Sequence, residues 1–186
     1  MHIPWTYMMT SSSQSYQNKG KALLRAAKKG QLNDVRKYLA GGAPVEYADF
    51  WGETPLYKAS ANDHGQVVQV LLECGAAIDY TCNGKMALHA AASMNRLSAI
   101  YMLIKYGANV DCTKPKNDLS VIQTRQNGQT PLYNVVNSWN PNVMAVEYLL
   151  QAGATTGIAT KVTIPCLIRK TLDTRTSKRF TYVPQN

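Results

Sequence analysis

The chain has 186 residues, of which 45% are hydrophobic and 17% are charged, a balance that is typical of a folded globular protein and excludes disorder throughout. No apolar stretch is long enough to cross a membrane. The net charge of +9 is distributed unevenly along the chain.

Basic residues are concentrated in two segments. Seven lie between Lys19 and Lys37 against one acid, Asp34, and six lie from Lys161 onward against Asp173. These ends fit a contact with an acidic partner, a membrane surface or a nucleic acid. They equally fit solvated faces that keep the protein soluble.

The first segment has an unusual composition, because residues 1–18 contain no Lys, Arg, Asp or Glu. We predict a disordered leader over residues 1–19, although Trp5 and Tyr7 could dock onto the domain that follows. The leader lacks the basic start and continuous apolar core of a secretory signal. A Ser-rich, acid-poor leader also resembles those that some bacterial secretion systems or organelles accept.

From residue 20 to residue 160 the chain repeats itself. GETPLY at 52–57 and GQTPLY at 128–133 are nearly identical, and weaker copies occur at 84–89 and 19–24. These phrases align Leu23, Leu56, Leu88 and Leu132, at intervals of 33, 32 and 44 residues. Gly-Ala pairs follow at the same period, and an apolar i, i+3, i+4 pattern lies before each pair. Three features with one period predict four units, each of helix, turn and helix.

The residues of one unit explain its local structure. Thr54 is expected to cap the first helix and Pro55 to occupy its first position. Gly75 is expected to end the second helix in the left-handed conformation. One such unit cannot bury its own apolar face, so the units must stack on one another.

These residues resemble the ankyrin-repeat family. GETPLYKASANDHGQVVQVLLECGAAID (52–79) follows the family's motif over nearly its whole length, and KMALHAAASMNRLSAIYMLIKYGANVD (85–111) follows it almost as well. GKALLRAAKKGQLNDVRKYLAGGAPVE (20–46) resembles an N-terminal capping unit with lysines on its outer face. The resemblance implies an all-α solenoid of helix pairs with β-hairpin fingers and a concave surface for binding. It divides the chain into units at about 20–48, 49–80, 81–111 and 124–157.

Two segments depart from the repeat. The 44-residue step places a long finger at residues 112–123, which is either a partner contact or a tolerated insertion. Residues 161–186 fit a capping helix of a truncated fifth unit around Leu167, followed by a basic tail. A β-hairpin between Lys161 and Val183 is the alternative for this segment.

The repeat register also identifies candidate binding residues. Phe50 and Trp51 are expected at a fingertip, where large exposed aromatics favour contact with a partner; packing against the neighbouring finger is the alternative. The predicted partner-binding set is Phe50, Trp51, Glu53, Asn62, Asn83, Lys85, Ser93, Met94, Lys114, Lys116, Gln126, Gln129 and Asn137.

The sequence does not assemble a catalytic site. His2 lies in the leader, and His64 and His89 occupy repeat positions where bracing hydrogen bonds are expected. No Ser or Cys stands beside a His with an orienting carboxylate, and there is no Gly-rich phosphate loop. The four cysteines are too widely spaced for a metal knuckle. We therefore expect no enzyme activity, no cofactor, no metal and no small-molecule substrate.

The predicted function is binding of another protein as an adaptor, inhibitor or effector. The alternative is an anionic partner, nucleic acid or membrane, bound by the basic ends. The basic residues are expected at the caps and not along the groove, which favours the first function. Without an export signal, the cysteines are expected to be free thiols in an intracellular protein of the cytoplasm or nucleus. Delivery into a host cell as a bacterial effector is a further alternative.

Overall fold

The computed structural model describes residues 5–81, 86–112, 130–138 and 141–155, with side chains from residue 14 onward. Within these residues there are eight helices and no β-strand. The helices are α1 (Trp5–Lys29), α2 (Leu32–Ala40), α3 (Pro55–Ala61), α4 (Gly65–Glu73), α5 (Ala87–Ser93), α6 (Leu97–Lys105), α7 (Pro131–Val136) and α8 (Val143–Gln151).

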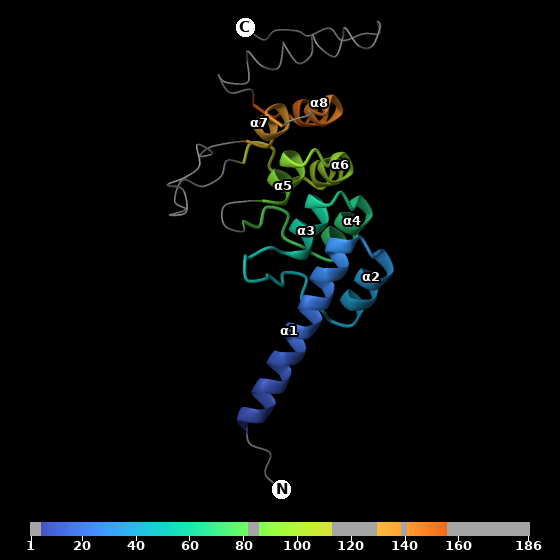
Figure 1. The fold of residues 1–186 in the computed structure, drawn as a ribbon, viewed down its shortest axis with the longest axis vertical. Helices are drawn as coiled ribbons and strands as arrows, with labels where there is room; N and C mark the ends of the chain where they lie inside the picture. Colours follow the sequence, from blue (N-terminus) through green and yellow to red (C-terminus); the bar gives the residue numbers. More distant parts are fainter. Residues whose placement is uncertain (1–4, 82–85, 113–129, 139–140, 156–186) are drawn as a thin grey trace, which may run out of the picture.

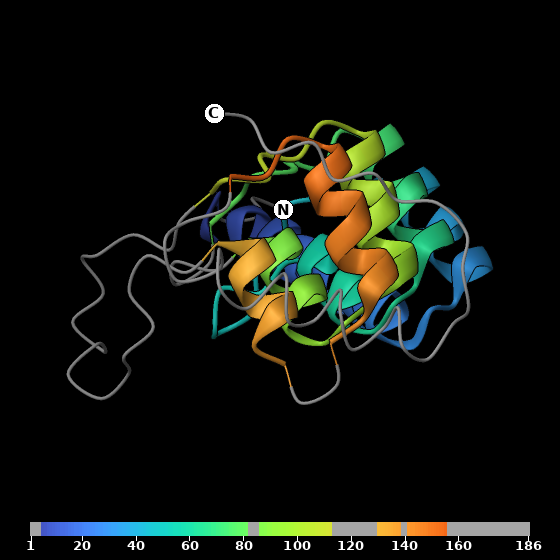
Figure 2. The same cartoon turned by 90° about the horizontal axis from the view of Figure 1, so that it is seen from above.

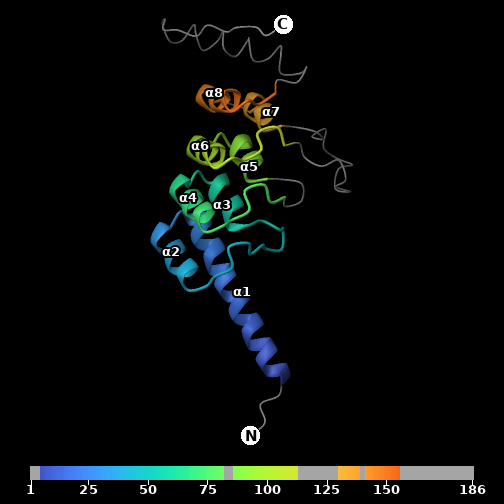
Figure 3. The ribbon, with the colours of Figure 1, turned by 180° about the vertical axis from the view of Figure 1, so that it is seen from behind.

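The helices form two parallel layers (Figures 1 and 2). The first helices of the units, α1, α3, α5 and α7, pack on one another in that order, and the second helices, α2, α4, α6 and α8, form the layer behind them. The loops between units emerge on the side of the first helices (Figure 3). The predicted all-α solenoid of stacked helix pairs is confirmed.

The leucine register of the sequence is the register of the core. Leu23, Leu56, Leu88 and Leu132 occupy equivalent places in the first helices and are at most 3% exposed. The second helices contribute an equivalent buried set, which is Val35, Val68, Ile100 and Val146. Each unit therefore adds one apolar layer to a continuous core, and neighbouring units cover the layers of the two inner units from both sides.

In all four units, a glycine with positive φ follows the second helix and caps its C-terminus. Gly75 has a φ of +86°, which only glycine adopts without strain. Its N–H donates to the Leu72 carbonyl at 3.0 Å, and the Ala76 N–H donates to the Leu71 carbonyl at 3.0 Å. This is a Schellman cap, and the same pair of bonds recurs at Gly42, Gly107 and Gly153. The prediction for Gly75 is confirmed.

An acidic side chain links each unit to the next. Glu46 Oε1 accepts from the Ala77 N–H at 2.6 Å, and Asp79 Oδ1 accepts from the Asn109 N–H at 3.2 Å. Asp111 Oδ1 accepts from both the Thr155 N–H, at 2.7 Å, and the Thr155 hydroxyl, at 3.0 Å. All three acids stand three residues after the alanine of a Gly-Ala pair. They form a ladder of inter-unit hydrogen bonds, to which we refer as the acidic ladder.

The prediction of a disordered leader over residues 1–19 is wrong for the described part of that segment. Helix α1 begins at Trp5, and its first turns project beyond the stack (Figure 1). Residues 5–18 contain neither glycine nor proline. A helix that is already nucleated by packing extends through such residues at little cost per residue.

The fingers also differ from the hairpins that the resemblance implied, since no described finger residue belongs to a β-strand. In the finger that precedes α3, the Asp49 N–H donates to the Glu53 carbonyl at 3.2 Å, and the Gly52 N–H donates to the Asp49 carbonyl at 2.8 Å. These bonds close a tight turn. They do not continue into the hydrogen-bond ladder of a β-hairpin. The long finger at 112–123, apart from Cys112, and the C-terminal segment at 161–186 lie outside the described residues.

Replacement of Asp111 by Ala tests the acidic ladder. The variant loses both bonds to Thr155 and is expected to loosen the fourth unit by about 1 kcal/mol. Hydrogen exchange followed by mass spectrometry should show faster exchange in α7 and α8, with α3 and α4 unchanged. Glu147→Ala, which removes a carboxylate of α8 outside the ladder, is the control. Equal acceleration in both variants would contradict a specific role for the ladder.

Candidate protein-binding surface

The turn before α3, residues 49–53, is braced by one carboxylate. Asp49 Oδ1 accepts from the Trp51 N–H at 3.0 Å and from the Glu53 N–H at 2.9 Å. Gly52 supplies a positive φ of 73° at the tip. Lys58 of α3 forms ion pairs with Asp49, at 3.5 Å, and with Glu53. The turn is therefore tied to the rigid first helix of its unit, and we call residues 49–53 the fingertip.

The fingertip presents two large aromatic side chains to solvent. Phe50 is 95% exposed and Trp51 is 64% exposed. Their ring centroids lie 6.0 Å apart, with the rings nearly perpendicular. Most of the Phe50 side chain and about two thirds of the Trp51 side chain are therefore accessible to a partner. The repeat register predicted that both residues are exposed, and in the structure both are.

The side chains of three predicted site residues, Glu53, Asn62 and Asn137, form interactions within the protein that the sequence did not indicate. Glu53 is half-buried and paired with Lys58. Asn62 Nδ2 donates to the Lys58 carbonyl at 2.8 Å, and Asn137 Nδ2 donates to the Tyr133 carbonyl at 3.0 Å. Both asparagines are exposed but satisfy the last turns of α3 and α7. Their side chains combine a capping role with a place on the open face.

Ser93 and Met94 end α5 at the corresponding place. Ser93 is exposed and donates its hydroxyl to the Ala90 carbonyl at 3.0 Å, and Met94 is 57% exposed. Met94 therefore adds an apolar element to the side of the first helices. The other predicted site residues lie outside the described residues: Asn83, Lys85, Lys114, Lys116, Gln126 and Gln129.

The structure adds one feature of the N-terminal capping unit, a row of basic residues on α1. Lys21, Arg25 and Lys28 follow one another at intervals of four and three residues on α1, and all three are exposed. Lys28 stands five residues after Leu23, the position of Ala61, Ser93 and Asn137 relative to their own leucines. These basic residues therefore belong to the first-helix face that forms the groove. The sequence analysis placed these bases in the N-terminal capping unit, and the leucine register was the signal that could have assigned them to the first-helix face of that unit.

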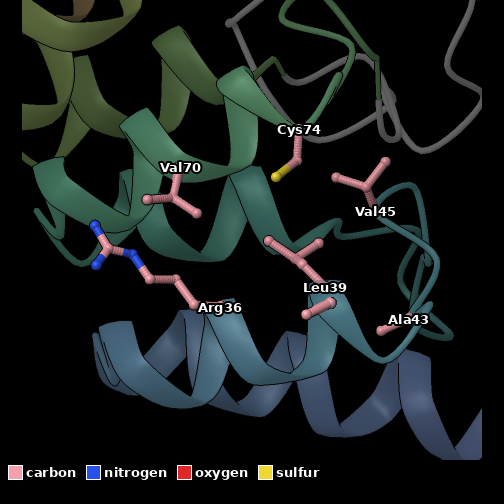
Figure 4. Close-up of a pocket in the computed structure, with 7 residues that line it drawn as sticks. Arg36, Leu39, Ala43, Val45, Val70 and Cys74 are labelled. Carbon is pink, nitrogen blue, oxygen red and sulfur yellow. The ribbon is translucent and has the colours of Figure 1, made fainter.

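The opposite side of the stack has a shallow hollow between α2 and α4, of about 450 Å³ (Figure 4). Its lining is mostly aliphatic and comprises Arg36, Leu39, Ala40, Ala43, Val45, Val70 and Cys74. No charged or polar group in it converges on a common point. It offers apolar surface but no arrangement for chemistry.

The described histidines have structural partners. His64 Nε2 lies 3.1 Å from the Lys28 carbonyl, and its ring packs directly on Gly30. His89 is 2% exposed, with Nδ1 3.7 Å from Cys112 Sγ. Burial, and secondarily Asp79, raise the pKa of the Cys112 thiol to about 12, which keeps it in the unreactive protonated form. Among the described residues, no group of three or more His, Cys, Asp or Glu side chains could hold a metal ion.

Comparison with known proteins agrees with this architecture. The family model "Ankyrin repeats (3 copies)" matches residues 23–114. The chain belongs to the ankyrin-repeat family. No helix in the described part of the chain has the length and apolar character to cross a membrane.

Three curated relatives show the range of proteins in which similar repeats occur. The chain is 32% identical over 126 residues to the rice (Oryza sativa subsp. japonica) "Probable E3 ubiquitin-protein ligase XBOS34", covering 66% of this chain and 24% of the relative. It is 43% identical over 60 residues to mouse (Mus musculus) "GA-binding protein subunit beta-2", covering 32% and 14%. It is 30% identical over 92 residues to human (Homo sapiens) "Ankyrin repeat and SOCS box protein 3", covering 47% and 18%. The chain thus spans a quarter or less of each of these relatives.

The bracing of the fingertip can be tested with Asp49→Ala. The variant removes the acceptor for the Trp51 and Glu53 amides. Because the local opening free energy should fall by about 1 kcal/mol, these amides should exchange about fivefold faster. Amide exchange of these two residues by NMR is the measurement. Asp34→Ala, on α2, should leave both rates unchanged. Unaltered rates in Asp49→Ala would show that the carboxylate does not order the turn.

Proposed function

We propose that the chain is a non-catalytic module that binds another protein through its concave surface, with Phe50 and Trp51 as the central anchors. The supporting observation is the fingertip itself, in which two exposed aromatic rings stand on a turn that is tied to α3 by Asp49 and Lys58. Aromatic side chains dominate the energetics of protein interfaces. A turn that is already ordered loses little entropy on binding.

The family supports this function, because ankyrin repeats are protein–protein interaction modules. The rice relative carries the name of an enzyme and the human relative the name of a SOCS box protein. The matched region is a minor part of each, so we do not carry over either whole-protein activity. An adaptor, an inhibitor and an effector all use the same binding surface.

An anionic partner is the second candidate, and the basic face of α1 is the observation in its favour. A nucleic acid or membrane bound mainly through Lys21, Arg25 and Lys28 would lose affinity steeply as salt rises. An interface anchored by Phe50 and Trp51 would lose little. A salt titration of the isolated complex therefore separates the two candidates.

We also propose that the protein acts inside a cell. Cys74 is exposed and Cys112 is buried, and both are free thiols. Free thiols of this kind persist in reducing compartments.

The double variant Phe50→Ala, Trp51→Ala tests the anchor. Each truncation is expected to cost about 2 kcal/mol or more, so that partner affinity falls at least about thirtyfold. The partner is first isolated by crosslinking and mass spectrometry with the native chain, and Kd values are then measured by calorimetry.

A matched control is available on the outer helices. Tyr101→Ala, Met144→Ala also removes two exposed apolar side chains and is expected to leave the affinity within about twofold. If both double variants bind the partner as tightly as the native chain, the anchor site is wrong.

A further inference from the structure

We propose that the partner segment is acidic where it crosses the first unit and apolar where it meets the fingertip of the second unit. The inference rests on the proposed protein-binding function and adds the chemical class of the bound segment. It follows from the basic face of α1, from the place of the fingertip beside α1, and from the uncharged or compensated residues at the equivalent described positions of the later first helices.

The basic face consists of Lys21, Arg25 and Lys28, with Lys29 beside them. All four side chains are exposed. Helix α1 contains no Asp or Glu along its whole length. Among the described residues, the ion pairs within 4.0 Å are those of Lys58 with Asp49 and Glu53, so no described acid neutralises this face. Its buried opposite side is formed by Gly20, Leu23, Ala26 and Ala27.

The fingertip loop is attached to α1 through the buried side of that helix. Tyr47 is 8% exposed and packs over Gly20, where a Cβ would lie 2.2 Å from Tyr47 Cδ2. Gly20 directly precedes Lys21, and Tyr47 lies three residues before Phe50. Lys19 Nζ also donates to the Gly41 carbonyl at 2.8 Å, which holds the start of the same loop on α1. α1 packs beside α3, and in the leucine register Lys21 corresponds to Thr54, which directly follows the fingertip. One extended segment can therefore contact both the basic face and the aromatic pair.

At the described positions of the later first helices, no uncompensated base continues the basic face. At the position of Lys28, the later units carry Ala61, Ser93 and Asn137. At the position of Arg25 the second unit carries Lys58, whose charge is offset by Asp49 and Glu53. A nucleic acid strand would present phosphates along the whole groove. At these equivalent positions of the later units, no uncompensated base is present to bind them. An acidic segment of limited length fits this distribution better.

The size of the basic face sets the number of acids. From Lys21 to Lys28 the helix rises about 10 Å, the length of about three extended residues. The face therefore accommodates two or three carboxylates. Phe50 and Trp51 then receive an apolar or aromatic side chain a few residues further along, and Met94 continues the apolar contact.

The experiment uses a displayed library of random 12-residue peptides, selected on the full chain. Kd values of the enriched peptides are measured on the native chain and on three variants. The charge variant is Lys21→Gln, Arg25→Gln, Lys28→Gln, and the anchor variant is Phe50→Ala, Trp51→Ala. The matched control is Arg36→Gln, Lys37→Gln, Lys105→Gln, which removes the same charge from exposed residues of α2 and α6. Thermal melts by circular dichroism verify that all variants fold.

The expected peptides carry two or three Asp or Glu residues close to an apolar or aromatic residue. Their affinity should fall at least about tenfold on the charge variant and less than about twofold on the control. Peptides without an acidic bias, equal losses on both charge-removing triples, or no enrichment at all would overturn the inference. So would a 12-nucleotide single-stranded DNA that binds more tightly than the peptides and is lost on the charge variant.

The anchor variant keeps the two proposals separable. Peptides that lose affinity on the anchor variant but not on the charge variant leave the proposed function standing and refute the acidic segment. Peptides that lose affinity only on the charge variant refute the aromatic anchor.

Discussion

No unit of this protein can cover its own apolar face, and the rest of the structure depends on that constraint. Leu23, Leu56, Leu88 and Leu132 are buried because a helix pair lies next to each of them. The backbone groups at the helix ends are satisfied by glycine caps, and the acidic ladder ties each unit to the next. Stacking consumes two sides of every unit. The first helices and fingers remain free along one face, which makes that face available for a partner without any cost to the core.

The exposed aromatic side chains of the fingertip stand on an ordered turn. Phe50 and Trp51 would be unfavourable on a mobile loop, but Asp49 and Lys58 hold their turn against α3. A partner therefore gains aromatic contact while paying little ordering entropy. Charge is distributed along the same face, with bases on α1, a neutralised cluster at Lys58 and uncharged residues at Ser93 and Asn137. Among the described residues of this face, uncompensated positive charge is therefore confined to the first unit.

Much of the fold could be predicted from the sequence because the same local signals occur in several units and support one another. The leucine spacing, the cap at Gly75 and the exposure of Phe50 and Trp51 each follow from a position within the unit, and the structure agrees with all of them. Two features required three-dimensional information. The extension of α1 to Trp5 depends on helix propagation from a packed unit, which composition does not show. The absence of strand pairing in the described fingers depends on the short turn that Asp49 closes. The place of the basic residues on the exposed face of α1, by contrast, follows from the register of Leu23.

The most direct test of the account is native-state hydrogen exchange of a Leu88→Ala variant, measured helix by helix. Leu88 is 1% exposed at the centre of the stack, and its truncation should cost about 2–5 kcal/mol. If neighbouring units cover one another, protection falls in α3, α4, α7 and α8 together with α5 and α6. Loss confined to α5 and α6, with full protection on both sides, would contradict the account.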